Sequence, residues 1–268
     1  MERLNIAVAG LGLIGGSFLK AAEAAGHTAK GYHHGERPDL RDADVIIVSL
    51  PPSAIEPWIR ANAPAFRDGA IVVDVCGVKT PLFDAFKREG LANRWHLVPG
   101  HPMAGREVGG FANATADLFA GASMILTPYP YTGRGPLDTL EAFFLSVGFA
   151  RVVFTTPEEH DRMISHTSQL CHLISSAYVR DELAQRHHGF SAGSFRDMVR
   201  VGAPDPDIWT ELFLLNRMPL MDTLDRYIAR LVDFREALAS NDAARLHRAL
   251  DEGVEAKKKI LAKTENLR

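Results

Sequence analysis

The sequence is poor in cysteine and contains no long hydrophobic run. Its 268 residues include two cysteines, Cys76 and Cys171, which are too few for a disulfide framework and favour a reducing compartment. No apolar run approaches the roughly 20 residues that a membrane span needs. No signal-peptide pattern precedes the first apolar stretch. We therefore expect a soluble globular protein that resides in the cytoplasm.

An excess of charge of either sign is also missing. Lysine and arginine number 30 and aspartate and glutamate 33, which gives a net charge of -3. Nucleic-acid-binding proteins usually carry a strong excess of basic residues, so this balance argues against a nucleic-acid partner. Hydrophobic residues make up 46% of the chain, enough to bury a sizeable core.

Glycine and proline become scarce after about residue 150. Eighteen of the 22 glycines lie at or before Gly148, and eleven of the 15 prolines lie at or before Pro136. Because both residues interrupt helices, the first part should hold many short elements and the second a few long helices. We therefore predict two domains, spanning residues 1–154 and 155–268.

Apolar strand-like runs alternate with helix-like stretches in the first domain. The predicted strands are Asn5–Ala9, Ala29–Tyr32, Val45–Ser49, Ala70–Val75, His96–Val98, Met124–Leu126 and Val152–Phe154. The predicted helices are Ile14–Ala25, Ser53–Phe66, Pro81–Glu89 (with Gly90 as its stop) and Leu137–Val147. This alternation predicts an α/β fold with a doubly wound, Rossmann-type parallel sheet. Only residues 35–44 separate the second and third strands, so the helix expected there should be vestigial or missing.

The second domain should be entirely helical. One helix begins at Pro157 and meets no further glycine or proline until after Arg186. Three more helices are predicted at Pro206–Asn216, Pro219–Leu238 and Asn241–Thr264. The last helices carry an apolar stripe too extensive for one small domain to cover: Leu212, Leu215, Leu220, Leu224, Ile228 and Leu231. We therefore predict a homodimer formed through this domain.

The first strand leads directly into a glycine-rich turn with the spacing G-x-G-x-x-G. Gly10 permits the tight turn, Gly12 lets the backbone approach a pyrophosphate, and Gly15 allows close packing of helix on strand. The following helix offers unpaired N–H groups and a positive dipole end to phosphates. Since the turn lies between a strand and a helix, it predicts a dinucleotide-binding domain over residues 1–154.

The second strand leaves the choice between NAD and NADP open. An acidic residue after this strand would bind the ribose hydroxyls of NAD, and a nearby arginine would accommodate the 2′-phosphate of NADP. Here Tyr32 is followed by His33 and His34, and Arg37 lies a few residues further on. His34 is expected to be a surface residue. The predicted cofactor-binding residues are Gly10, Leu11, Gly12, Leu13, Ile14, Gly15, His33, Ser49, Leu50 and Pro51.

Three segments offer side chains for a substrate site. His101 lies in a turn rich in glycine and proline after the fifth strand, and a neutral imidazole can accept a proton from a hydroxyl. Ser168 and His172 are four residues apart and should share one helix face. Arg196 and Arg200 could each hold a carboxylate. Each of these residues also has an ordinary structural interpretation, as a turn residue or a solvent-exposed side chain.

A metal site is not predicted. His160, His166 and His172 lie on the same predicted helix, but their separations do not match a compact H-x-x-x-H pair.

Taken together, these segments resemble the prephenate/arogenate dehydrogenase family over almost the entire chain. The matching segments are Gly10–Ser17 (G-L-G-L-I-G-G-S), Asp74–Lys79 (D-x-x-S-V-K), His101–Gly105 (H-P-M-A-G), His160–Asp161 with Thr167–His172 (H-D…T-S-Q-L-x-H), and Phe195–Arg200 with Asp205, Pro206, Trp209 and Asn216 (F-R-D-x-x-R…D-P-x-x-W…N). The resemblance implies an NAD- or NADP-dependent oxidative decarboxylation of prephenate to 4-hydroxyphenylpyruvate, a step of tyrosine biosynthesis.

The resemblance also implies a role for each site residue. His101 would accept the hydrogen bond of the ring hydroxyl, and Ser168 would orient His101 or the substrate. His172 and Arg200 would hold the substrate carboxylates, whereas Arg196 would form a structural pair with Asp197. The chain departs from the family at Gly77, where many relatives have a serine that would touch substrate or nicotinamide. The sequence ends at Arg268, so we expect neither a regulatory amino-acid-binding domain nor a fused mutase.

Three alternatives remain. Arogenate could be the substrate in place of prephenate, and nothing in the sequence indicates whether tyrosine inhibits. A β-hydroxyacid dehydrogenase would usually carry a catalytic lysine on the helical domain, but residues 157–188 contain none. A nucleotide-sensing protein without catalysis is disfavoured because His101, Ser168, His172 and Arg200 are all present.

Overall fold

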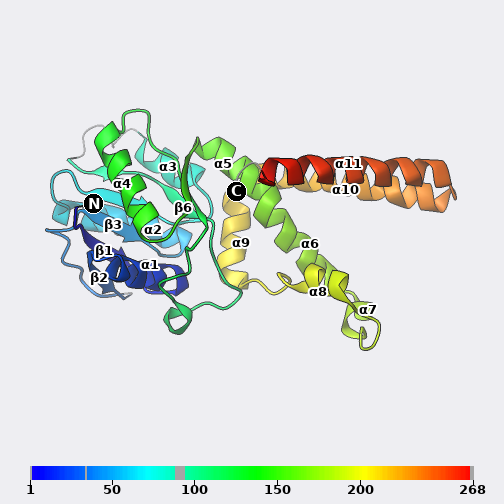
Figure 1. Cartoon of the computed structure of the whole chain (residues 1–268), viewed down its shortest axis with the longest axis horizontal. Helices are drawn as coiled ribbons and strands as arrows, with labels where there is room; N and C mark the ends of the chain where they lie inside the picture. Colours follow the sequence, from blue (N-terminus) through cyan, green and yellow to red (C-terminus); the bar gives the residue numbers. More distant parts are fainter. Residues whose placement is uncertain (1, 34, 88–93, 266–268) are drawn as a thin grey trace. The chain divides into compact units, whose positions relative to one another are not determined.

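The structure is a computed structural model that describes residues 2–33, 35–87 and 94–265 (Figure 1). The predictions for His34, Glu89 and Gly90 lie outside the described residues. By compactness the chain divides into two units, Met1–Pro219 and Leu220–Arg268. Among the helices of the described residues, none is long and apolar enough to cross a membrane.

A five-stranded parallel sheet forms the centre of the first unit. Its strands are β1 (Asn5–Ala9), β2 (Thr28–Tyr32), β3 (Val45–Val48), β4 (Ile71–Asp74) and β5 (His96–Leu97). They lie in the order β2-β1-β3-β4-β5, and every neighbouring pair is parallel. The predicted doubly wound fold is therefore confirmed. Because all strands run the same way, Gly10, Ser49 and Val75 leave the sheet at the same edge.

Three further strands form a separate sheet. Two of them were predicted as strands, but the third strand and the separation from the parallel sheet were not. These are β6 (Gly100–Pro102), β7 (Ser123–Leu126) and β8 (Arg151–Phe154), in the order β6-β7-β8. Strand β6 pairs antiparallel with β7, so His101 lies opposite Ile125 rather than in a turn. Only two residues separate β5 from β6, too few for the crossover that a parallel neighbour would need.

Helices cover both faces of the parallel sheet, which explains its unbroken apolar strands. Helices α1 (Leu13–Ala24) and α4 (Arg134–Ser146) supply Phe18, Phe143 and Phe144 to the core on one face. Helices α2 (Pro52–Asn62) and α3 (Thr80–Phe86) supply Ile55, Ile59 and Phe83 to the core on the other.

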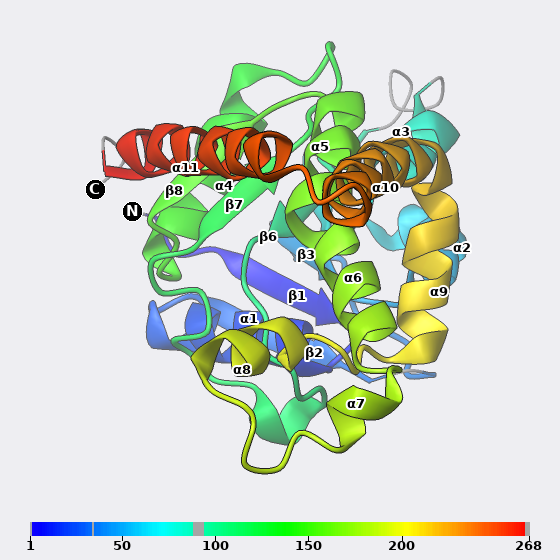
Figure 2. The same ribbon diagram turned by 90° about the vertical axis from the view of Figure 1, so that its right-hand side faces the viewer.

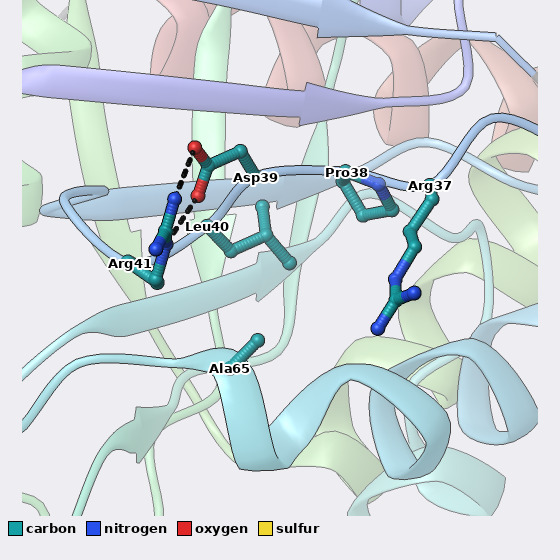
Figure 3. Close-up of a pocket in the computed structure, with 6 residues that line it drawn as sticks. All are labelled: Arg37, Pro38, Asp39, Leu40, Arg41 and Ala65. Carbon is teal, nitrogen blue, oxygen red and sulfur yellow. Dashed lines mark hydrogen bonds and ion pairs between the residues drawn. The ribbon is translucent and has the colours of Figure 1, made fainter.

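The helix missing between β2 and β3 is confirmed, because residues 35–44 contain no helix. A hollow of about 440 Å³ lies along this segment, lined by Arg37, Pro38, Asp39, Leu40, Arg41 and Ala65. Figure 3 shows Arg41 paired with Asp39 and the side chain of Arg37 turned away from that pair.

The helical part of the first unit begins with α5 (Pro157–Ile164) and α6 (Leu170–Tyr178), visible in Figure 2. A π-helical segment, Ser165–Gln169, joins them, so the run is continuous but not regular. It ends at Tyr178, short of the predicted Arg186. Three more helices follow: α7 (Glu182–Gln185), α8 (Gly193–Val199), which was not predicted, and α9 (Pro206–Leu215).

Two long helices make up most of the second unit, α10 (Arg217–Ala239) and α11 (Ala243–Glu265). Asn241 adopts a positive φ of 52° in the turn between them, a conformation that asparagine tolerates at a helix end. Arg245 on α11 binds Asp233 and Glu236 on α10, which ties the two helices together.

Candidate active site

The glycine-rich turn forms a close-packed cradle at the carboxyl edge of the sheet. A Cβ atom on Gly10 would lie 2.1 Å from the carbonyl oxygen of Ser49, and one on Gly15 would lie 1.9 Å from that of Gly10. A Cβ on Gly12 would meet no atom within 4 Å. The first and third glycines are therefore required by packing, whereas the second leaves open space. Such open space is what a pyrophosphate approaching the N-terminus of α1 needs.

A cavity of about 320 Å³ adjoins this turn at the end of β2. It is lined by Ala9, Gly10, Tyr32, His33, Gly35, Glu36, Arg37, Pro38, Leu50, Trp58 and Asn62. Among the predicted cofactor-binding residues, Gly10, His33 and Leu50 thus meet at one cavity. Leu11, Leu13 and Ile14 lie on the turn and first helical turn, whereas Ser49 and Pro51 flank Leu50 at the end of β3.

An acidic residue that the sequence reasoning passed over also lines this cavity. Glu36 folds back toward the end of β2, where its carboxylate accepts a hydrogen bond of 2.8 Å from the backbone N–H of His33. Arg37 lines the same cavity, and no ion pair holds it among the described residues. A carboxylate suited to ribose hydroxyls and a guanidinium group suited to a 2′-phosphate are therefore both present.

His101 belongs to a chain of three hydrogen-bonded side chains. Its Nδ1 lies 2.9 Å from Nε2 of His160, and Nδ1 of His160 lies 2.7 Å from Oδ1 of Asp161. His160 and Asp161 are nearly inaccessible to solvent, with exposed side-chain fractions of 0% and 3%. Helix α5 thus brings two buried side chains against the strand that carries His101.

A buried ion pair holds the backbone next to His101. Lys79 and Asp74 are fully buried and paired with each other. The ammonium group of Lys79 also donates to the carbonyl of Gly100 at 2.6 Å, and Asp74 accepts from the N–H of Gly100 at 3.2 Å. Asp161 in turn accepts from the backbone N–H groups of Lys79 and Thr80. The residue preceding His101 is therefore held at both of its polar backbone atoms.

These surroundings keep the imidazoles neutral. Burial lowers the pKa of His101 well below its usual value, and His160 and Lys79 lower it further. Burial also lowers the pKa of His160, against the opposing influence of Asp161. Burial disfavours ionisation of Asp161, but its hydrogen bonds from His160, Thr80 and Lys79 outweigh this and lower its pKa. The site therefore holds neutral histidines beside an ionised carboxylate.

The helical side of the site presents His172, Ser168 and Arg200. Nδ1 of His172 lies 3.1 Å from the carbonyl oxygen of Val201, and its ring packs against Trp209 at a tilt of 41°, with the ring centroids 3.7 Å apart. Ser168 is half-buried on the π-helical segment. Among the described residues no hydrogen bond joins it to His101, whose Nδ1 contacts His160 instead.

Arg200 follows α8 and pairs with Glu107, 93 residues earlier in the chain, at 3.1 Å. Both side chains are more than half exposed. The prediction that Arg196 pairs with Asp197 is wrong. Among the described residues Arg196 forms no ion pair. Adjacent residues on a helix point in different directions, so Arg196 and Asp197 do not face each other.

Gly77 lies beside the His101 ring. A Cβ atom at Gly77 would be 3.8 Å from Cε1 of His101 and 3.5 Å from the Leu212 side chain, both ordinary contact distances. The Cβ of the serine that many relatives carry at this position would therefore fit without displacing either neighbour.

Sequence reasoning identified His101 but missed its partners. Asp161, Asp74 and Lys79 were noticed only as parts of matching motifs. His160 was considered besides only as a metal ligand, and none of the four was given a role beside His101. An aspartate at the end of a buried strand, with a lysine five residues later, is the signal that was available, since a buried charge needs a partner. Nothing local indicates the contact between His101 and His160, because 59 residues separate them.

Comparisons with known proteins agree with this geometry. Residues 19–154 match the family model described as prephenate dehydrogenase, nucleotide-binding domain, and residues 156–252 match the one described as prephenate dehydrogenase, dimerization domain. Cyclohexadienyl dehydrogenase of Zymomonas mobilis is 30% identical over 266 residues, covering 89% of each chain. Prephenate dehydrogenase of Bacillus subtilis is 28% identical, covering 91% of this chain and 72% of that protein.

Solved structures give the same result. The crystal structure of Synechocystis arogenate dehydrogenase superposes with a TM-score of 0.79 at 25% identity, covering 96% of this chain and all of that one. The two family models together account for most of the chain and meet between residues 154 and 156. The chain therefore belongs to the prephenate dehydrogenase family.

Proposed function

We propose that this chain catalyses the oxidative decarboxylation of prephenate to 4-hydroxyphenylpyruvate with NAD or NADP, in tyrosine biosynthesis. The observation that carries the proposal is a neutral His101 whose Nδ1 is engaged by His160, at the edge of the sheet where the glycine cradle lies. Family membership supplies the substrate class. The ring of prephenate carries a hydroxyl at C4 and a carboxylate at C1, and its aromatisation drives the reaction.

His101 would act at the ring hydroxyl. When bound, the dinucleotide supplies the acceptor for the hydride that leaves C4. As the hydride leaves, the hydroxyl proton passes to Nε2 of His101, the ring nitrogen that His160 leaves free. Carbon dioxide then departs from C1, and the electron pair of the broken bond completes the aromatic ring. His101 can return its proton to the resulting phenolate oxygen, so the step consumes no net proton.

The helical side would bind the carboxylates. Arg200 offers a planar fork that suits a carboxylate, and a bound substrate would replace Glu107 as its partner. His172 and Ser168 lie on the same helical run as His160 and would complete the contacts to the substrate. Gly77, beside the His101 ring, would leave room for the substrate without offering it a hydroxyl.

Arogenate is the second candidate substrate. It carries an ammonium group where prephenate has the keto oxygen of its side chain. The carboxylate of Glu107, exposed beside Arg200, would suit that ammonium while Arg200 binds the neighbouring carboxylate. This observation favours testing both substrates rather than prephenate alone.

We also propose a cytoplasmic homodimer with a dinucleotide-binding domain over residues 1–154 and a helical substrate and dimerisation domain over residues 155–268. The meeting point of the two family models supports this boundary. Exposed apolar side chains on α10, including Ile228 and Leu231, support dimerisation.

A single assay tests the proposal against its alternatives. Purified protein is mixed with prephenate or arogenate and with NAD or NADP, and reduced nucleotide is followed by absorbance. We expect turnover of at least one substrate, with carbon dioxide released in equal amount. Reduction without carbon dioxide release would indicate a β-hydroxyacid-type oxidation, and nucleotide binding without reduction would indicate a sensor.

A further inference from the structure

The hydrogen bonds that link Asp161, His160 and His101 have a definite donor and acceptor at each step. Asp161 accepts hydrogen bonds from the backbone N–H groups of Lys79 and Thr80, at 2.8 and 2.9 Å, and its pKa is lowered. It is therefore an ionised carboxylate that only accepts hydrogen bonds. The hydrogen of the 2.7 Å contact between Asp161 and His160 must then sit on Nδ1 of His160.

The same logic continues one residue further. His160 is buried with a lowered pKa, so its ring is neutral and carries one hydrogen. Because that hydrogen is on Nδ1, Nε2 of His160 has only a lone pair. The 2.9 Å contact between the two rings must then be a hydrogen bond donated by Nδ1 of His101. A neutral His101 that donates from Nδ1 has its lone pair on Nε2.

We propose that His160 and Asp161 are positioning residues that select the tautomer of His101, so that Nε2 is the atom able to accept a proton. They act through His101 and not on the substrate. The inference rests on the proposed function only in assigning a use to that lone pair.

The surrounding charges support this division of labour. The groups around the rings are the buried Asp74, Lys79 and Asp161 and the half-buried Cys76, whose thiol stays protonated because desolvation raises its pKa to about 11. Lys79 and Asp74 hold the backbone of Gly100 and thereby the position of His101. When Nε2 gains a proton, the positive ring donates through His160 toward Asp161, which spreads the charge without exposing it to water.

Two substitutions at one position separate this role from simple packing. His160→Gln keeps an acceptor, because the amide oxygen can take the hydrogen of His101 Nδ1 while the amide N–H₂ faces Asp161. His160→Leu fills similar space but offers no acceptor. His166→Leu, at an exposed histidine on the adjoining π-helical segment, is the matched control.

The direct readout is the ¹⁵N spectrum of the full-length protein labelled in its histidines, with His101 assigned from the spectrum of His101→Asn. We expect His101 to carry its hydrogen on Nδ1 in the unaltered protein and in His160→Gln. In His160→Leu we expect a mixture of tautomers. This measurement needs no substrate, so it does not depend on the proposed reaction.

Kinetics provide the second readout. We expect His160→Leu to lower kcat by about 10²-fold or more with little change in KM, as for other enzymes whose base is held in the wrong tautomer. His160→Gln should recover activity to within about tenfold, and His166→Leu should leave it unchanged. Melting temperature and nucleotide binding, measured on each variant, verify folding.

The possible results lead to different conclusions. The proposal is overturned if His101 carries its hydrogen on Nε2 in the unaltered protein, or if its tautomer is the same in His160→Leu. It is also overturned if Gln and Leu lower kcat equally. The tautomer of His101 could change in His160→Leu while the unaltered protein turns over neither prephenate nor arogenate. That result would support the tautomer selection and contradict the proposed function.

Discussion

Arg200 and Glu107 form an ion pair across 93 residues of sequence, with their charged atoms 3.1 Å apart. The side chains are 65% and 61% exposed, so solvent screens the attraction and the pair contributes little stability. A substrate carboxylate can therefore take the place of Glu107 at small cost.

This pair leads to a prediction about substrate affinity. Arg200→Ala should raise KM for prephenate about ten- to a hundredfold, the loss expected for a charge-assisted contact of 1.5–3 kcal/mol. KM for the nucleotide should stay nearly constant. Arg200→Lys should recover part of the loss, because an ammonium cannot make the forked contact. Steady-state kinetics with both substrates varied measure these effects.

Arg196→Ala is the matched control, since Arg196 is exposed on the same helical segment and forms no ion pair among the described residues. It should leave both KM values unchanged. A rise in KM for the nucleotide instead of prephenate in Arg200→Ala would show that the substrate site is misplaced.

Substitution of His101 should affect the catalytic rate more than the affinity for substrate. We expect His101→Asn to lower kcat by about 10²–10⁴-fold with a small change in KM, because proton acceptance belongs to the transition state. Initial rates at saturating nucleotide measure this. An unchanged kcat would remove His101 from the mechanism.

The pH dependence follows from the lowered pKa of His101. His101 must be unprotonated to accept a proton, and burial favours the neutral ring. Activity should therefore be retained as pH falls from 8 to about the ordinary histidine value of 6.5, and decline only below it. A profile of kcat/KM against pH measures this in buffers of constant ionic strength. An acid limb centred above pH 6.5 would contradict the assigned environment.

Gly77 offers a substitution that should improve the site. Gly77→Ser adds a Cβ at ordinary contact distance from His101 and Leu212, so the melting temperature should change little. One added hydrogen bond to substrate, worth about 0.5–1.5 kcal/mol, should raise kcat/KM about two- to tenfold. Gly77→Ala, which adds the same Cβ without a hydroxyl, is the control. Equal kcat/KM in the two variants would contradict a role for the hydroxyl.

The oligomeric state can be tested on α10. Ile228 and Leu231 are 46% and 50% exposed within one chain, and both belong to the predicted apolar stripe. Light scattering at micromolar concentration should give the mass of a dimer. Ile228→Glu combined with Leu231→Glu should yield a monomer, because an interface does not accommodate two unpaired charges. Arg235→Glu, an exposed polar position on the same helix, should remain a dimer.

Features with a local cause were predictable from the sequence. The predicted strands lie within one or two residues of the observed ones because buried parallel strands are unbroken apolar runs. The turn at Gly10 was predicted because few residue types permit such a tight turn. The absence of a helix before Val45 was predictable from the shortness of the connection alone, since only residues 35–44 separate the two strands. Leu220 from the predicted stripe is instead buried at 5% exposure, because an apolar pattern does not say which neighbour covers it.

Features that depend on distant contacts were not predictable. Strand β6 exists only because β7 supplies its hydrogen bonds, and its own sequence, with Pro99 and Pro102, is typical of a turn. Glu36 reaches the end of β2 by folding back across a loop. The link between His101 and His160 requires two separate elements to pack together, which no single segment encodes.

The π-helical segment Ser165–Gln169 limits where residues can be inserted into the sequence or deleted from it. A π turn contains one residue more than an α turn, so the residues of α6 that follow Gln169 are rotated by about 100° relative to an uninterrupted α-helix. His160 precedes the segment and His172 follows it, so the angular phase between them depends on that additional residue. Loss of a single residue here would allow the helix to become regular and turn His172 away from the Val201 carbonyl, while His160 kept its contact with His101. Relatives should therefore keep the number of residues in this segment unchanged.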